Sequence, residues 1–426
     1  MVAALCAGIM SRTSADGADI AFASFSPVRG NIACRVRSFY TVPYPRDLRE
    51  RVLRISEARE VDKEELCRLS MSLGDFFAAA LEKALAYLEI RPEEVAAVGC
   101  HGQTVGHFPV KRRGFLKETG ASLQVGEPSF LAQRTGITVV SDFRPADIAA
   151  GGMGAPLVPA FHGILLRGRG CFSSFQSLGG IGNATVVSPQ GKVLAAFDTG
   201  PGNLLIDGAV RRLSAGRKTM DKNGAWALRG TVQEKFLAGL IRGDRFLALP
   251  PPKSTGRERY GRPRLEKIIA SARKEGLSRE DLLATLTAYT AETVRLAFDR
   301  YVLPKWPVKE IFLGGGGGKN PVLAAFLAAR MPELKIRATE TLGLPPQYIK
   351  AAAFAYLAYL ALCRQTGNVP VATGGHPAVL GKISPGSRGT FMNSPRGTFI
   401  SSSPMLNECP PPECPPQVKA LFPRRA

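Results

Sequence analysis

One carboxylate stands beside a glycine-rich turn in residues 198–203, which read Asp-Thr-Gly-Pro-Gly-Asn. An apolar run of strand length, residues 192–197, precedes Asp198 and follows a turn signal at residues 188–191. We therefore predict that Asp198 lies at the exposed C-terminal end of a strand. Ligands of open α/β sheets bind at such ends, so Asp198 is a candidate reacting group.

The residues after Asp198 suit the binding of an anion. Gly200 and Gly202 allow backbone angles and close approach that other residues do not, and Pro201 fixes the torsion between them. The apolar stretch after Asn203 predicts a helix whose N-terminus would face a bound anion. The alternative is that Asp198 only caps this helix.

Other glycine-rich turns could hold phosphate. A polar turn at residues 11–17 follows a strand-like run, Gly179 and Gly180 follow another, and a predicted strand at 310–313 runs into five glycines at 314–318. The last segment is not a Walker A loop, because Asn320 follows Lys319, and it lacks the GxGxxG spacing. A flexible loop is the alternative for a glycine run.

The elements that would position these turns recur in two halves. Each half begins with three predicted strands joined by turns, and helices and further strands follow. The strands are predicted at 4–10, 20–25, 32–40, 95–99 and 137–141, and again at 172–178, 184–187, 193–197 and 310–313. The helices are predicted at 63–88, 129–135, 279–301 and 347–363. This pattern predicts two similar α/β halves that face each other across a cleft.

Composition narrows the class of protein. The chain has 426 residues, 45% of them hydrophobic, so it can bury a large core. It contains no apolar run near the roughly 20 residues of a membrane helix and no basic leader before an apolar segment, so we expect a cytoplasmic protein without a membrane partner. Eight scattered cysteines and four histidines lack metal-ligand spacing, so no metal site of protein side chains is expected.

The net charge of +21 comes from 56 Lys and Arg against 35 Asp and Glu. These cations are spread along the chain without interleaved aromatic residues, so we expect either a basic surface without a special role or attraction of anionic substrates, and no nucleic acid partner. Residues 384–426 are dominated by Pro, Ser, Gly and Arg, which predicts a disordered tail.

Several segments together resemble the anhydro-N-acetylmuramic acid kinases, bacterial enzymes of the sugar kinase and actin superfamily. The matching segments are 8–17, 100–104, 142–144, 154–162, 198–203, 252–258, 315–317 and 320–321. They lie in the family's order and span residues 8–383.

The resemblance implies two ribonuclease-H-like, actin-like ATPase domains, at 1–145 and 146–383, with a terminal helix that packs on the first domain. It also implies a homodimer. The reaction it implies adds water across the 1,6-anhydro bond and transfers the γ-phosphoryl group of ATP to O6, giving N-acetylmuramic acid 6-phosphate and ADP for peptidoglycan recycling. Asp198 matches the catalytic aspartate, the general base for the water.

The resemblance also assigns binding residues for ATP, Mg²⁺ and the sugar. Those for ATP are Ser11, Arg12, Thr13, Ser14, Ala15, Asp16, Gly17, Ala18, Asp19, Gly179, Gly180, Gly315, Gly316 and Gly317. Those for the sugar are His101, Gln103, Gly202, Asn203 and Lys350. Because His101 and Gln103 follow the predicted strand at 95–99, they either contact the sugar or only stabilise the turn there. Asp16 or Asp19 either holds Mg²⁺ through water or stabilises its turn.

Four residues depart from the family's pattern. Arg12 replaces a glycine, Met153 a glutamine, Ser177 an asparagine and Lys350 a glutamate. Arg12 either strains the loop or binds phosphate with its guanidinium. Two hypotheses follow: an active kinase, or a catalytically impaired family member that binds nucleotide or sugar as a sensor or partner.

Overall fold

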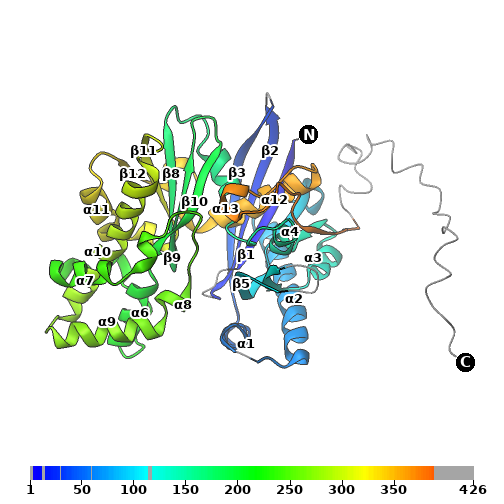
Figure 1. Ribbon diagram of the computed structural model, residues 1–426. Coiled ribbons are helices and arrows are strands. Elements are labelled where there is room, and N and C mark those ends of the chain that lie inside the picture. The colour runs from blue at the N-terminus through cyan, green and yellow to red at the C-terminus, as the bar shows by residue number, and fades with distance from the viewer. Residues whose placement is uncertain (1–2, 12–14, 29, 59, 114–117, 388–426) are drawn as a thin grey trace, which may run out of the picture.

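Two β-sheets of matching topology stand side by side in the computed structural model, which describes residues 3–11, 15–28, 30–58, 60–113 and 118–387 (Figure 1). The first sheet has the strand order β13-β7-β4-β1-β2-β3 and the second β10-β9-β8-β11-β12. The first contains β1 (Ala4–Ser11), β2 (Gly17–Val28), β3 (Asn31–Pro43), β4 (Val95–Cys100), β7 (Val139–Ser141) and β13 (Lys382–Ser384). The second contains β8 (Phe172–Leu178), β9 (Ile181–Val187), β10 (Val193–Pro201), β11 (Val308–Gly314) and β12 (Lys335–Ala338).

The predicted duplication is confirmed by strand pairing. In the first sheet, β1, β2 and β3 form an antiparallel meander and β4 and β7 add in parallel on the other side of β1. In the second sheet, β8, β9 and β10 repeat the meander and β11 and β12 add in parallel beside β8. The α/β fold of two ribonuclease-H-like units is therefore confirmed.

Helices cover both sheets, and one hairpin was not predicted. Beside the first sheet lie α1 (Arg46–Glu57), α2 (Lys63–Tyr87), α3 (Pro128–Thr135) and α4 (Phe143–Ala149). The second sheet is flanked by α6 (Leu204–Leu213), α7 (Glu234–Arg242), α8 (Arg257–Tyr260), α9 (Arg262–Lys274), α10 (Arg279–Ala297) and α11 (Pro321–Arg330). The hairpin is β5 (Gln103–Arg113) paired with β6 (Glu118–Val125).

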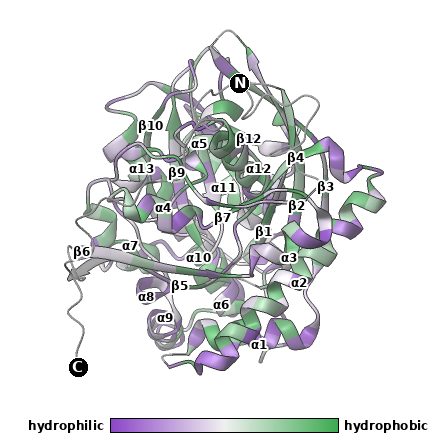
Figure 2. Ribbon diagram, turned by 90° about the vertical axis from the view of Figure 1, so that its right-hand side faces the viewer, coloured by the Kyte–Doolittle hydropathy of each residue, from purple (hydrophilic) through white to green (hydrophobic). Residues whose placement is uncertain are grey.

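Local signals explain the long helices. Asp62 caps α2 by accepting a hydrogen bond of 2.9 Å from the backbone N–H of Glu65, and the helix buries one apolar face. In Figure 2, α1 and α2 accordingly carry both hydrophilic and hydrophobic residues. No helix among the described residues has the length and apolar character needed to cross a membrane.

The helix α12 (Ile349–Leu362) connects the two units, since it follows the second sheet in the chain but packs on the first. Every residue of α12 except Lys350 is buried. Glycines let the helix approach: a Cβ on Gly8 would lie 1.9 Å from the carbonyl oxygen of Ala351, and one on Gly99 would lie 2.0 Å from that of Phe354. The short strand β13 also returns to the first sheet, beside β7.

The ends of the predicted domains stay predictions. Ser384, placed at the start of the tail, pairs with Val139 in the first sheet. The rest of the predicted tail from residue 388 onward lies outside the described residues.

Candidate active site

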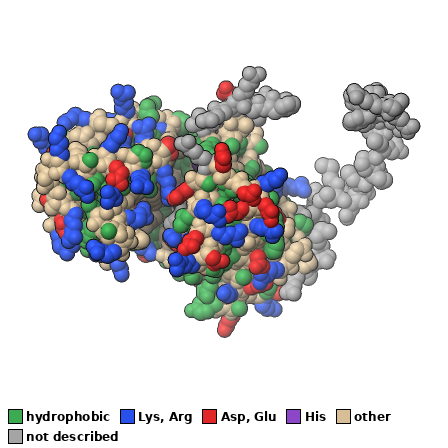
Figure 3. Space-filling view, turned by 90° about the horizontal axis from the view of Figure 1, so that it is seen from below, with side chains coloured by type: hydrophobic (Ala, Val, Ile, Leu, Met, Phe, Trp, Pro, Cys, Tyr) green, Lys and Arg blue, Asp and Glu red, His purple; other side chains and the backbone are tan. Residues whose placement is uncertain are grey.

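A cleft of about 1090 Å³ lies between the two units, lined by residues from both. Seen from below, a hollow separates two lobes, both with many Lys and Arg side chains (Figure 3). The sequence-predicted residues that line it are Asp16, His101, Gly179, Gly180, Asp198, Asn203, Gly315, Gly316, Gly317 and Lys350. Residues of the prediction that do not line it are Ser11, Ala15, Gly17, Ala18, Asp19, Gln103 and Gly202. Arg12, Thr13 and Ser14 lie outside the described residues.

Asp198 lies within a strand, contrary to our prediction that the strand ends before it. β10 continues to Pro201, because its pairing with β9 resumes after an irregularity between Asp198 and Gly200. At this bulge Gly200 has φ +151°, in the region that favours glycine. The irregularity places Asp198 in the cleft wall, where it is half-buried rather than exposed.

Two hydrogen-bond donors hold the carboxylate of Asp198, and both bind its Oδ2 oxygen. The Ser254 hydroxyl donates to Oδ2 at 2.9 Å and the Thr255 backbone N–H donates to the same oxygen at 2.8 Å. Burial raises the pKa of Asp198 to about 6, against the opposing effect of these two hydrogen bonds. Such a group changes protonation state close to neutral pH, as a general base requires.

The alternative role of Asp198 as a helix cap is wrong. The residue at the N-cap position of α6 is Asn203, whose side chain donates to the Leu178 carbonyl at 3.1 Å instead of capping the helix. The hydrogen bonds that Asp198 accepts come from the 254–255 loop and not from α6. Its carboxylate is thus held in the cleft wall without a role in starting the helix.

Three glycine turns meet at the second unit's end of the cleft. The Asn203 backbone N–H donates to the Gly179 carbonyl at 2.7 Å, and a Cβ on Gly202 would lie 2.2 Å from the same oxygen. A Cβ on Gly315, where φ is +74°, would lie 2.9 Å from the Gly179 backbone nitrogen. Around Gly180 a Cβ would meet nothing within 4 Å, so backbone faces open space there. This backbone surface suits phosphate or nucleotide, which glycines admit closely.

His101 enters the cleft as a neutral ring with both nitrogens engaged. Nδ1 donates to the Gly102 carbonyl at 2.8 Å, and the Arg144 Nε donates to Nε2 at 3.0 Å. Burial and the nearby Arg144 charge hold the pKa of His101 well below its usual value. The sequence reasoning noted Arg144 in a matching segment but gave it no role; its guanidinium lines the cleft beside His101.

Three other predicted residues, Ser11, Gln103 and Asp19, lie in the interior of the first unit. The Ser11 hydroxyl donates to the side-chain oxygen of Gln103 and lies 2.6 Å from the Tyr44 hydroxyl, so Ser11 and Gln103 face each other in a buried network. Asp19 is 1% exposed and accepts from the Thr41 hydroxyl at 2.8 Å. Asp16, in contrast, lines the cleft 3.9 Å from Arg49.

The described residues offer no cluster of protein side chains for a metal ion. Among the described residues, no group of three or more His, Cys, Asp and Glu side chains could hold a metal ion. Mg²⁺ in kinases takes phosphate oxygens and water with one or two carboxylates, and Asp16 in the cleft fits that smaller requirement.

Sequence reasoning gave no role to Ser254 and Thr255, which hold Asp198. The available signal was their position in the 252–258 segment, which was among the matching segments. Contacts across 56 and 57 residues of sequence cannot be predicted from spacing alone.

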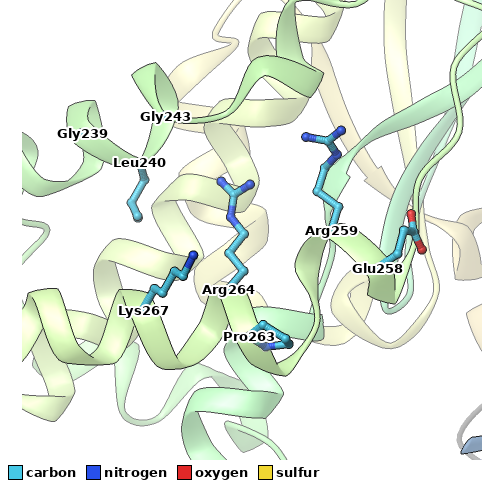
Figure 4. Close-up of a pocket in the computed structure, with 8 residues that line it drawn as sticks. All are labelled: Gly239, Leu240, Gly243, Glu258, Arg259, Pro263, Arg264 and Lys267. Carbon is cyan, nitrogen blue, oxygen red and sulfur yellow. The ribbon is translucent and has the colours of Figure 1, made fainter.

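A second hollow, of about 350 Å³, lies on α7, α8 and α9, and Asp198 is not among the residues that line it (Figure 4). Its Arg264 and Arg259 are already engaged with the buried carboxylate of Asp244, at 3.1 and 3.9 Å. This hollow therefore has a structural explanation and is not the reaction centre.

Comparisons with known proteins agree with this geometry. A family model described as anhydro-N-acetylmuramic acid kinase matches residues 4–386. The chain is similar to proteins named anhydro-N-acetylmuramic acid kinase from Caldanaerobacter subterraneus subsp. tengcongensis, at 37% identity over 89% of this chain and 96% of that protein, and from Rippkaea orientalis, at 38% over 88% and 97%. A protein of the same name from Pasteurella multocida is 37% identical over 89% of this chain and 96% of its own.

Proposed function

The chain belongs to the anhydro-N-acetylmuramic acid kinase family, and on that premise we propose that it opens the 1,6-anhydro bond of this sugar and phosphorylates O6 with ATP. The observation that carries the proposal is Asp198, a half-buried carboxylate in the wall of the cleft with a pKa near 6. A base of this pKa is largely deprotonated at neutral pH yet can accept a proton from water.

The proposed reaction needs only one reacting side chain. Asp198 accepts a proton from a water molecule as the water oxygen bonds to the anomeric carbon. The bond from that carbon to O6 breaks, O6 bonds to the γ-phosphorus, and the bond from this phosphorus to ADP breaks. The proton on Asp198 then leaves to solvent, which gives N-acetylmuramic acid 6-phosphate and ADP.

The remaining catalytic work is positioning and charge neutralisation. The backbone around Gly179, Gly180 and Gly315 supports an ATP site. The turns at Gly179 and Gly315 pack closely against each other, and the backbone at Gly180 faces open space that a phosphate could enter. When bound, Mg²⁺ would neutralise phosphate charge, and Asp16 is the described carboxylate that we propose holds it through water. His101, Asn203 and Lys350, which line the cleft, are proposed to contact the sugar.

Nothing among the described residues favours the alternative of a catalytically impaired binding protein. Asp198 keeps its carboxylate in the cleft and two donors on one oxygen. Of the four departures, Ser177 and Lys350 line the cleft together with Asp198. The cytoplasmic location and the homodimer stay predictions from sequence.

The test is sugar-dependent ADP release. Purified protein is incubated with Mg-ATP and anhydro-N-acetylmuramic acid, and N-acetylmuramic acid, which lacks the anhydro bond, serves as the matched control. We expect ADP and an O6-phosphorylated product with the anhydro sugar only. ADP release that is equal with and without the sugar would contradict the proposal.

A further inference from the structure

His162, on α5 (Pro159–Leu165), is a buried histidine of the cleft wall that the proposed reaction does not use. It is 2% exposed, and its ring stacks on Phe175 with centroids 3.9 Å apart and an interplanar angle of 19°. Nδ1 lies 3.0 Å from the Thr185 hydroxyl. The ring is therefore fixed by two contacts with the second sheet.

Strand register places this ring beside the reaction centre. Asp198, Asn183 and Ser177 lie opposite one another on β10, β9 and β8, and all three line the cleft. In the next row of the same face, Phe175, two residues before Ser177, lies opposite Thr185, two residues after Asn183. Side chains two apart along a strand are roughly 7 Å apart, so His162 covers the row directly next to that of Asp198.

The other ring nitrogen of His162 lacks a partner. Within the described part of the chain, Nε2 is buried and makes no hydrogen bond. A buried polar atom without a partner is costly, and native proteins satisfy nearly all of them. Since His162 lines the cleft, the missing partner is expected to come from a bound molecule.

The chemistry of this ring selects the kind of partner. Burial, with the charge of Lys350 nearby, lowers the pKa of His162 to about 3, so the ring is neutral at physiological pH. The Thr185 hydroxyl can donate to Nδ1 or accept from it, so in either tautomer Nε2 has one hydrogen bond to make. A hydroxyl or an amide fits both tautomers. His101 and Lys350, which are proposed to contact the sugar, line the same cleft as His162.

We propose that Nε2 of His162 hydrogen-bonds a neutral hydroxyl or amide group of the sugar and thereby selects and orients it. This inference rests on the proposed function, because it takes the sugar of that reaction as the ligand. It adds a sugar-binding residue, held by Phe175 and Thr185, next to the carboxylate of Asp198.

The variant that tests this keeps the stacked ring but removes both nitrogens. His162→Phe is combined with Thr185→Val so that the Thr185 hydroxyl is not left unpaired, and Thr185→Val alone is the matched control. We expect the double variant to raise KM for the anhydro sugar about tenfold and to change KM for ATP less than about twofold. The control should raise KM for the sugar clearly less.

A sugar KM within twofold of wild type in the double variant, or an equal rise in the control, would overturn the inference. A measurement on the wild-type chain tests the inference even if the double variant does not fold. The ¹⁵N chemical shift of His162 Nε2 should change when the sugar is added. An unchanged shift at saturating sugar would also overturn the inference. If wild type turns over the sugar and the double variant has the same sugar KM, this inference is overturned and the proposed kinase activity is not. Absent wild-type turnover with a shifted Nε2 signal overturns the proposed kinase activity and supports the sugar contact.

Discussion

The backbone N–H of Thr255 donates a hydrogen bond of 2.8 Å to Oδ2 of Asp198, the oxygen to which the Ser254 hydroxyl also donates. Both donors therefore hold one oxygen, and no described residue donates to Oδ1. This arrangement fixes the carboxylate while it leaves an oxygen for a water molecule. A base held in this way does not need to reorganise before it accepts a proton.

The first prediction concerns the pH dependence of catalysis. Only deprotonated Asp198 can accept a proton, and its pKa is raised to about 6, so kcat/KM should fall as pH drops through about 6. Ser254→Ala removes a hydrogen bond that stabilises the charged form, so the pKa should rise and the acid limb should move to higher pH.

The pH–rate profile of each variant tests this prediction. Ser271→Ala, which removes an exposed hydroxyl on α9, is the control and should leave the limb in place. An acid limb that does not move in Ser254→Ala would show that this hydrogen bond has no part in setting the pKa of the base.

The second prediction concerns the contact between α12 and the first sheet. Gly8→Ala places a Cβ 1.9 Å from the Ala351 carbonyl oxygen, where backbone must shift on both sides, so the free energy of unfolding should fall by about 1–3 kcal/mol or more. Gly239→Ala on α7 is the matched control, because a Cβ there meets nothing within 4 Å. It should stabilise by about 0.5–1 kcal/mol. Urea unfolding measures the free energy of unfolding of both variants. Equal values for Gly8→Ala and Gly239→Ala would contradict the close packing of α12 on β1.

The third prediction concerns the buried carboxylate of Asp244. It accepts from the Tyr260 hydroxyl at 2.8 Å and the Tyr289 hydroxyl at 2.5 Å, and Arg264 lies 3.1 Å away. Tyr289→Phe should lower the free energy of unfolding by about 1–3 kcal/mol, because a hydrogen bond to a buried charge is lost. KM for either substrate should stay unchanged, since none of these four side chains lines the cleft.

The control for Tyr289→Phe is Glu266→Ala. Glu266 pairs with Arg212 at 3.2 Å on the surface, and an exposed pair contributes at most about 1 kcal/mol. Thermal unfolding gives the loss of stability in each of the two variants, and steady-state kinetics on the same samples gives KM for both substrates. A larger loss in Glu266→Ala, or a raised KM in Tyr289→Phe, would be the contradictory result.

The duplicated fold could be predicted from sequence because its signals are local. Segments of strand length that run into glycine turns marked β8 and β11, and helical spacing marked α10. The end of β10 was missed because the glycines that signal a turn at residues 200 and 202 also permit a bulge within a strand. The β5–β6 hairpin was missed because Pro109 and the three consecutive basic residues at 111–113 interrupt the apolar pattern expected of a strand in β5.

The site could be predicted only in part. Asp198 and the glycine turns were found because their residue types are distinctive. The role of Ser11 and Gln103 as partners was hidden, since they meet only when β1 and β5 are placed together across 92 residues. His162 ends a matching segment but gave no signal of its own. Only the position of the residue in the cleft wall, together with its buried Nε2 that has no partner among the described residues, distinguishes it from an ordinary buried histidine.

The most direct test of the account is sugar-dependent ADP formation by wild type and by Asp198→Asn, with ATP binding measured on both. The asparagine side chain keeps an acceptor for Ser254 and Thr255 but cannot take a proton from water. We predict that turnover falls by about 10²–10⁴-fold while the affinity for ATP changes little. Turnover by Asp198→Asn within tenfold of wild type, with ATP bound equally, would contradict the claim that Asp198 is the general base.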